Sequence, residues 1–540
     1  MPPTGSTAEG QSALEQGRWA DARTAFEAAL AERESPEALD GLGEALWWLG
    51  EPQAGLAYRE RAFVGFRLAG DPIRAATSAI AVCVSYGVNF GNGAAAAGWL
   101  ARAESVVDNP DAGPLCGWFW LMRGYFAPEF ELACEWIRRA LAHARETGDI
   151  DLELSALADL GGKLVTAGQV EEGLALIDEA MAGTLAGECR RLETVVWASC
   201  TMLGACEIAG DLLRAQQWLR VADEFTERYG CPFMYATCRT HYGGLLVAKG
   251  HWTQAERELA VAIRMSGAAG PVPHALALAQ LAQLRFRQGR LEDAEALASD
   301  CGNDLVTARI RLARGEVAVA VALLERCVDN TTLPVEAATS LGVLVEAHLA
   351  AADLPAARAA VDRLTALAAA QRSEYVTAQA ALACGRFAVA TGRLDQAVTD
   401  LQRGLDGFSR LDLPVDTAQT RLALARAHAA GNTELAIAEA RAALKALDEL
   451  GAATDADAAA ALLRELGAPG RTGPRAGGVL TRREQEVLHL ITLGLSNPEI
   501  ATRLYISRKT AAHHVSRVLA KLGVRNRAEA TAVALQNGLA

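Results

Sequence analysis

The sequence lacks the features of a secreted or membrane protein. Its first residues, Met-Pro-Pro-Thr-Gly-Ser-Thr-Ala, contain neither a basic segment nor an apolar one, so they do not resemble a secretory signal. No uncharged apolar run reaches the roughly 18 residues that a membrane span requires. We therefore expect a cytoplasmic protein without a membrane partner.

Cysteine and histidine give little sign of disulfides or metal sites. The 540 residues include 11 cysteines, an odd number, and none belongs to a Cys-x-x-Cys pair, so reduced and mostly buried thiols are expected. Cys231, Cys238 and His241 have poor spacing for zinc ligands. His513 and His514 are adjacent, which turns their side chains about 100° apart on a helix. We expect no metal and no other cofactor.

Motifs of catalysis and of phosphorelay control are also missing. The chain has no Gly-x-x-x-x-Gly-Lys-Ser/Thr loop to cradle phosphates, and no nucleophile–base pair is evident. Its start shows neither the strand-rich alternation nor the clustered acidic residues of a phosphoacceptor receiver domain. The sequence therefore favours a protein that is not an enzyme and carries no fused ATPase or receiver domain.

The composition indicates helices throughout. Proline is scarce, with 17 residues in 540, and there are no alternating β-branched runs. Alanine and leucine are abundant and favour helices. We expect an all-α fold.

A motif recurs along residues 1–466. A glycine is followed by a small residue at +5, an apolar residue at +9 and a small residue at +12. This pattern predicts helical hairpins, because glycine closes the turn and small residues let the second helix approach its neighbours. Strong copies begin at Gly17, Gly168, Gly210, Gly250, Gly315 and Gly392, and weaker ones at Gly50, Gly289 and Gly431.

The copy that reads Gly-Arg-Trp-Ala-Asp-Ala from Gly17 resembles a tetratricopeptide repeat. Most strong copies recur at about 39 to 42 residues rather than the usual 34 or so. The resemblance implies an α-solenoid over residues 1–466, in which the segment at about 71–162 is less regular and is predicted only as helical.

Five aromatic residues gather at two places in this region. Packing in the core is the more frequent use of such clusters, and a ligand groove is the alternative. They are Trp47, Trp48, Trp118, Phe119 and Trp120.

Residues 467–478 are rich in Gly, Pro and Arg and have no apolar face, which predicts a flexible linker. Four short helices are expected after it. Thr481 caps the first, with Glu484 completing a capping box, and Gly494 ends it. Asn497 caps the second, with proline at its first helical position. Ser507 is expected to cap the third helix, and Asn526 and Glu529 open a fourth that runs to about Asn537.

The third of these helices has two distinct faces. Val515, Val518, Leu519 and Leu522 form an apolar stripe at helical spacing. The opposite face is short and basic, and suits a major groove roughly 12 Å wide. That face consists of Arg508, Lys509, Ala512, His513, Ser516 and Arg517.

Residues 479–540 resemble the LuxR/FixJ-type helix-turn-helix domain of bacterial transcription regulators. The family most often has valine where Ala511 stands and a lysine or other polar residue where Ala512 stands. The resemblance is carried by Leu480-Thr481, Arg483-Glu484, Glu486-Val487-Leu488, Gly494, Ser496-Asn497, Glu499-Ile500-Ala501, Leu504, Ile506-Ser507, Lys509-Thr510, His514, Lys521-Leu522-Gly523-Val524 and Arg527.

The resemblance implies a four-helix domain that inserts its third helix into the major groove of double-stranded DNA. The fourth helix commonly forms a dimer contact in this family. The residues that we expect to bind DNA are Thr481, Asn497, Arg508, Lys509, Thr510, Ala512, His513, His514, Ser516, Arg517 and Lys521.

Charge supports this interpretation. Residues 479–540 contain nine Lys+Arg and four Asp+Glu, a balance of +5, whereas the whole chain carries −13. The other 478 residues therefore carry −18. A basic domain on an acidic body is expected where one small part of a chain contacts nucleic acid.

The sequence thus predicts a sequence-specific DNA-binding transcriptional regulator that acts as a dimer. Its repeat array would sense a protein, peptide or small-molecule effector. The alternative is an interaction scaffold whose tail binds DNA only nonspecifically, and Ala511 and Ala512 are the residues that favour it.

Overall fold

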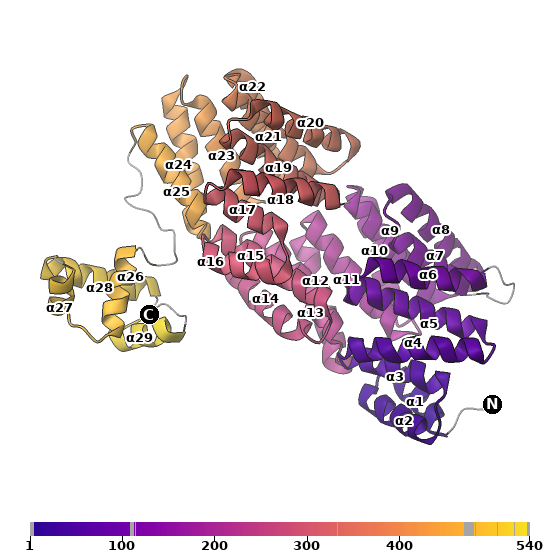
Figure 1. The fold of residues 1–540 in the computed structure, drawn as a ribbon. Helices are drawn as coiled ribbons and strands as arrows, with labels where there is room; N and C mark the ends of the chain where they lie inside the picture. The colour runs from indigo at the N-terminus through magenta and orange to yellow at the C-terminus, as the bar shows by residue number, and fades with distance from the viewer. Residues whose placement is uncertain are drawn as a thin grey trace.

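The computed structural model describes residues 5–107, 113, 115–331, 333–468, 480, 482–504, 506–522 and 524–536. Every regular element within these ranges is a helix, as Figure 1 shows. The all-α prediction is confirmed. The predicted cap at Thr481 and most of the predicted linker lie outside the described residues.

The first 24 helices form hairpins that stack in chain order, and α25 (Ala453–Glu465) follows the last of them (Figure 1). The α-solenoid prediction is therefore confirmed. The hairpins are α1 (Gly5–Glu15) with α2 (Trp19–Glu32), α3 (Pro36–Trp48) with α4 (Pro52–Leu68), α5 (Pro72–Val84) with α6 (Gly93–Val107), α7 (Leu115–Tyr125) with α8 (Phe130–Thr147), α9 (Ile150–Thr166) with α10 (Val170–Leu185), α11 (Leu192–Ala209) with α12 (Leu212–Tyr229), α13 (Pro232–Ala248) with α14 (Trp252–Ser266), α15 (Pro271–Arg287) with α16 (Leu291–Cys301), α17 (Asp304–Ala313) with α18 (Val317–Asn330), α19 (Pro334–Ala350) with α20 (Leu354–Ala370), α21 (Glu374–Ala390) with α22 (Leu394–Arg410), and α23 (Pro414–His428) with α24 (Thr433–Leu450).

The repeated motif works as its spacing predicts. In each strong copy the glycine has a left-handed φ, between 69° and 82°, and closes the turn between the two helices. The residues at +5 and +9 are buried in every strong copy, and the residue at +12 is buried in all but one. The exception is Cys327, which is half-buried.

The array winds so tightly that its beginning touches its middle. The indole Nε1 of Trp19 donates a hydrogen bond to the carbonyl oxygen of Tyr229 at 2.6 Å. Asn89 Nδ2 donates to the carbonyl oxygen of Ala269 at 2.8 Å. The rings of Trp47 and Phe233 lie 5.7 Å apart. These contacts close the first superhelical turn, because α2, α3 and the segment after α5 meet α12, α13 and the start of α15.

The second superhelical turn rests on the first in the same way. Lys249 Nζ donates to the carbonyl oxygen of Leu411 at 2.7 Å. The turn at Gly168 lies against the connection between α20 and α21, where a Cβ on this glycine would be 2.6 Å from the backbone nitrogen of Ser373. The hairpin glycines therefore serve two purposes: they allow a left-handed turn, and some also allow close contact between turns.

The less regular segment contains a π-helix, η1 (Ser85–Asn89), which continues α5. Gly87 in this segment packs against Phe126, and a Cβ there would be 2.3 Å from its ring. A π-helix adds a residue to the helical turn. Such elements are frequent at functional sites, and η1 lines the cavity described below.

One helix within the described residues, α11, is long and apolar enough to cross a membrane, by length and composition only. Half of it is buried inside the array. Core helices of soluble proteins often have this character, so the helix is weak evidence for a span.

Four helices follow the predicted linker and form a core of their own (Figure 1). Leu488, Ile500 and Val518 lie at its centre and are fully buried. The helices are α26 (Arg482–Thr492), α27 (Asn497–Arg503), α28 (Arg508–Leu522) and α29 (Arg527–Gln536).

Gly168→Ala and Gly315→Ala provide a matched test of the contact between turns. Both glycines have a left-handed φ, 82° and 79°, and occupy the same place in the motif. Alanine should cost about 1–2 kcal/mol at either position because of that backbone conformation. Only Gly168 faces another superhelical turn, since nothing lies within 4 Å of a Cβ at Gly315. We expect Gly168→Ala to lower Tm clearly more than Gly315→Ala in thermal unfolding, and equal effects would contradict the contact.

Candidate functional site

The helix α28 presents a continuous polar face to solvent. Arg508, Lys509, Thr510, His513, Ser516 and Arg517 are exposed, while Ala512 and His514 are half-buried beside them. The opposite face holds Ala511, Val515 and Val518 in the core, and Leu519 and Leu522 pack against it. The apolar stripe predicted from the sequence is confirmed.

The cap of α28 is also confirmed, because Ser507 Oγ accepts a hydrogen bond from the backbone N–H of Thr510 at 3.1 Å. The cap predicted for α27 is wrong by one residue. Ser496, not Asn497, precedes this helix, and both its backbone N–H and its hydroxyl donate to Glu499 Oε2, at 2.7 and 2.5 Å. These two bonds lower the pKa of Glu499. Serine fits here because Pro498 and Glu499 then occupy the first helical turn.

Asn497 belongs to α27 and is engaged within the domain. Its Oδ1 accepts a hydrogen bond from the guanidinium of Arg527 at the start of α29. Arg527 also donates to the carbonyl oxygen of Leu495 at 2.5 Å. Asn497 therefore ties α27 to α29.

Lys521 is engaged in a similar way. Its Nζ lies 2.5 Å from Glu484 Oε2, and the Glu484 side chain is only 4% exposed. The pair joins α28 to α26 through a nearly buried carboxylate. Losing either partner would leave a charge with little solvation, which is costly. The contact gives Lys521 a structural role that its sequence position did not reveal.

The structure corrects the significance of Ala511. Its side chain is fully buried in the core of the domain. The difference from valine at this position therefore changes the packing of α28 and not its solvent face. Of the two alanines that favoured a nonspecific scaffold, only Ala512 lies near the polar face.

Residues 478–534 match the GerE family, which comprises bacterial regulatory proteins of the luxR family. They form a LuxR-family DNA-binding domain. The helix-turn-helix of this domain comprises α27 and α28. The assignment covers the C-terminal domain.

Curated relatives share this LuxR-family domain. The chain is 50% identical over 60 residues to the transcriptional regulatory protein DegU of Brevibacillus brevis, covering 11% of this chain and 25% of that protein. It is 42% identical over 83 residues to the DNA-binding transcriptional activator DevR/DosR of Mycobacterium tuberculosis, covering 15% of this chain and 37% of that protein. The match thus spans 25% to 37% of the length of these relatives.

Two solved structures are similar to the chain at low sequence identity. One is a Rap protein complexed with competence and sporulation factor, with a TM-score of 0.39, 12% identity, and coverage of 59% of this chain and 99% of that chain. The other is the APC/C hetero-tetramer Cut9–Hcn1, with a TM-score of 0.41, 13% identity, and coverage of 84% of this chain and 95% of that chain.

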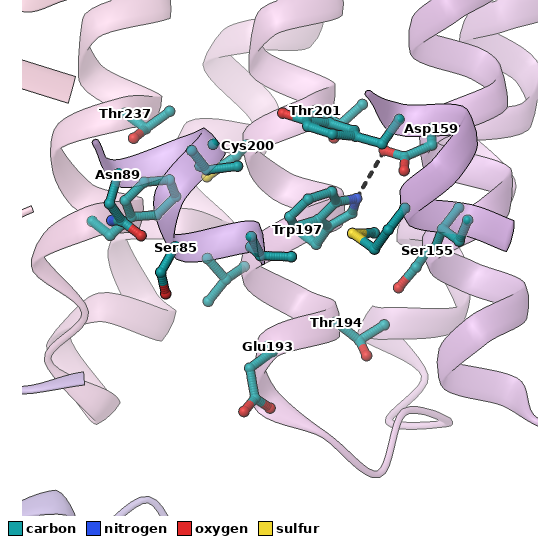
Figure 2. Close-up of a pocket in the computed structure, with 18 of the residues that line it drawn as sticks. Ser85, Asn89, Ser155, Asp159, Glu193, Thr194, Trp197, Cys200, Thr201 and Thr237 are labelled. Carbon is teal, nitrogen blue, oxygen red and sulfur yellow. Dashed lines mark hydrogen bonds between the residues drawn. The ribbon is translucent and has the colours of Figure 1, made fainter. Parts of the chain in front are cut away.

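The first superhelical turn of the array surrounds a cavity of about 980 Å³. Its wall is built from α3, α4, α5, η1, α7, α9, α11, α13 and α15, and is mostly apolar. Figure 2 shows Ser155 and Asp159 on one side, Trp197 and Thr194 in the middle, and Ser85 and Asn89 on the other side. The closure contacts of Trp47 and Asn89 form part of this wall.

The predicted aromatic clusters divide between the two uses considered for them. Trp47 and Trp118 line the cavity. Trp48 and Phe119 are core residues, with 1% and 3% exposure. Trp120 lies under the Arg139 guanidinium, 3.9 Å from its ring centre.

Asp159 is the polar residue of the cavity wall with the most unusual surroundings. Its Oδ1 accepts a hydrogen bond from Trp197 Nε1 at 2.8 Å (Figure 2). Its Oδ2 is buried and has no partner. Burial raises the pKa of the Asp159 carboxyl to about 7, although the Trp197 bond and the charge of Lys163 oppose that shift. Sequence reasoning missed this residue, because a single aspartate in a helix carries no signal of its own.

A second charged group lies elsewhere on the wall. Glu44 Oε2 lies 3.4 Å from Arg59 Nη2. Burial and the neighbouring Glu193 raise the pKa of Glu44, while Arg59 and Arg191 oppose the rise. Each of the two acids thus has an arginine nearby.

The three side chains considered as zinc ligands are Cys231, Cys238 and His241. They make ordinary contacts with other residues. Cys231 and Cys238 are buried, and the Cys238 sulfur lies 4.0 Å from that of Cys200. His241 Nδ1 lies 2.7 Å from Glu207 Oε2. Among the residues that the structure describes, no group of three His, Cys, Asp or Glu side chains is arranged to hold a metal ion.

Replacing Asp159 with asparagine should change how stability depends on pH. The folded-state pKa of about 7 lies above the ordinary value of 3.8, so the contribution of this carboxyl to stability is complete below pH 3.8 and is lost as pH rises to the folded pKa of about 7. Asparagine carries no charge at any pH. We expect the stability of Asp159→Asn relative to wild type to rise by roughly 2 kcal/mol between pH 5 and pH 8, measured as a growing difference in Tm. A difference that stays constant with pH would show that Asp159 ionises normally.

Proposed function

We propose that the protein is a sequence-specific transcriptional regulator whose helix α28 lies in the major groove of DNA. The observation that carries this proposal is the exposed face of α28, with Arg508, Lys509, His513, Ser516 and Arg517 on the solvent side of a LuxR-family domain. Long basic side chains alternate there with short polar ones. Such a face can approach base edges while its cations meet phosphates.

The residues of the proposed interface have separate roles. Arg508 and Lys509, at the start of α28, contact phosphates, as do Thr510 and Arg517. His513 and Ser516 read base edges. Thr481 and His514 contact the sugar-phosphate backbone of DNA. Asn497 and Lys521 belong to it mainly by holding α27 and α28 in place, since each is engaged within the domain.

The rest of the chain forms the regulatory part in this proposal. We divide the chain into a repeat array at 1–466, a linker at 467–478 and the DNA-binding domain at 479–540. The cavity in the first superhelical turn supports an effector site within the array. The regulator acts in the cytoplasm and docks as a dimer on two half-sites about one helical turn apart.

The proposal is tested by selecting duplexes from a random pool with the full chain and then measuring Kd for the selected and scrambled sequences. Sequence-specific proteins typically favour their sites by about 10³-fold or more. A preference of that order supports a regulator. Equal Kd values for selected and scrambled duplexes would favour the scaffold alternative, with nonspecific DNA binding.

Arg508→Ala and Lys509→Ala should weaken binding to all duplexes alike. Each variant removes about one phosphate contact, so the slope of log K against log salt should fall by about one per residue. Fluorescence anisotropy over a salt series measures this slope. Lys521→Ala is the matched control, because it removes a lysine that pairs with Glu484. It should lower the Tm of the domain and leave the slope nearly unchanged in protein that remains folded.

His513→Ala and Ser516→Ala should change which duplexes are preferred. A contact to a base edge discriminates against the wrong base by about 1–3 kcal/mol, so its loss relaxes one position of the site. Repeating the selection with each variant locates that position. If both variants select the same sequences as the wild type with the same stringency, then this face of α28 does not read bases.

A further inference from the structure

The cavity of the first superhelical turn has buried polar atoms that the protein itself does not satisfy. Asp159 Oδ2, Thr237 Oγ1 and Arg59 Nε are buried without a hydrogen-bond partner, and all three residues line the cavity. Buried polar atoms are nearly always paired, because leaving them unpaired costs free energy. Three such atoms around one cavity point to a ligand that supplies the missing partners.

The tryptophans of the wall offer ring surfaces rather than hydrogen-bond donors. Each indole N–H is already held by a side chain of the protein. Trp47 donates to Asn89 Oδ1 at 3.2 Å, Trp118 to Asp149 Oδ2 at 3.1 Å, and Trp197 to Asp159 Oδ1 at 2.8 Å. The ligand must therefore bring its own donor for Asp159 Oδ2.

The charged neighbours of Asp159 leave its carboxylate without an ion pair. Lys163, one turn further along α9, donates to the carbonyl oxygen of Tyr125 at 2.9 Å and makes no ion pair with Asp159. Tyr125 from α7 and Cys200 from α11 are the other titratable groups of the wall on this side. Asp159 is 4% exposed. A cation that paired with it would remove most of the penalty of burying its charge.

The other charged residues of the wall do not compete for this role. Glu44 and Glu193 lie beside Arg59 and Arg191, so both of these acids have arginines nearby. Asp159 is thus the carboxylate of the wall that lacks a nearby arginine partner. Ring faces of tryptophan attract cations, and Trp197 is bonded directly to Asp159.

We infer that the cavity binds an organic amine with an extended apolar, aromatic body, whose ammonium group donates to Asp159 Oδ2 beside the ring of Trp197. The volume of about 980 Å³ is at the upper end for small-molecule sites, which suits a body of several rings. This inference rests on the proposed effector site and names the ligand class for it.

Three fluorescent probes with the same body test the inference on the full chain. They are 9-(aminomethyl)anthracene, 9-anthracenemethanol and 9-anthracenecarboxylate, titrated by energy transfer from tryptophan. The amine should bind about tenfold more tightly than the alcohol or better, because charge-assisted hydrogen bonds are the stronger kind. The carboxylate should bind most weakly.

Asp159→Asn should remove the preference for the amine while leaving the affinity for the alcohol within about threefold of wild type. Circular dichroism and Tm establish that this variant is folded. Asp400→Asn is the matched control, because Asp400 is another nearly buried acid, 6% exposed, on α22 and outside the cavity wall. It should bind all three probes like the wild type.

Equal affinity for the amine and the alcohol would overturn the proposed ligand class, and so would an unchanged preference in Asp159→Asn. Failure of all three probes to bind would overturn the inference entirely. Binding of the selected duplex is measured on the same preparation. Loss of sequence preference there would reject the regulator, whereas an intact preference with no probe binding would reject only the cavity's role.

Discussion

The contact between the beginning and the middle of the array is the constraint on which the rest of the structure depends. Repeat proteins usually contact only their neighbours along the chain, and an open superhelix of hairpins encloses nothing. Here Trp19 bonds to Tyr229 across 210 residues, and Asn89 bonds to Ala269 across 180. These bonds turn a groove into a cavity, because they bring α13 and α15 opposite α3 and η1.

The same residues serve closure and cavity. Asn89 accepts a hydrogen bond from Trp47 and donates one across the closure, so a ligand that moves the Trp47 ring would act directly on the joint. The uncompensated oxygen of Asp159 lies on the same wall. Buried polar atoms that the protein leaves without a hydrogen-bond partner are often found at functional sites.

The elements that depend on local sequence pattern were predicted, whereas contacts between residues far apart in the chain were missed. The glycine motif predicted the hairpins, and the caps and apolar spacing predicted α26 to α29. The cap of α27 was placed at Asn497 and not at Ser496 because both residue types are good caps, and sequence alone does not distinguish two such neighbours. Lys521 was assigned to DNA because its partner Glu484 lies 37 residues away. The closure could not be predicted at all, since its acceptors are backbone carbonyls, which any residue supplies.

The most direct test of this account is the distance between the two sides of the closure in solution. Spin labels carried by non-natural amino acids at Gln16 and Arg228, which are both exposed, avoid the 11 native cysteines. Pulsed electron–electron double resonance on the full chain should give one short and narrow distribution of the distance between the two labels. This is expected because Gly17 packs on Tyr229. A long or broad distribution would mean that the first superhelical turn is open, and that the array encloses no cavity.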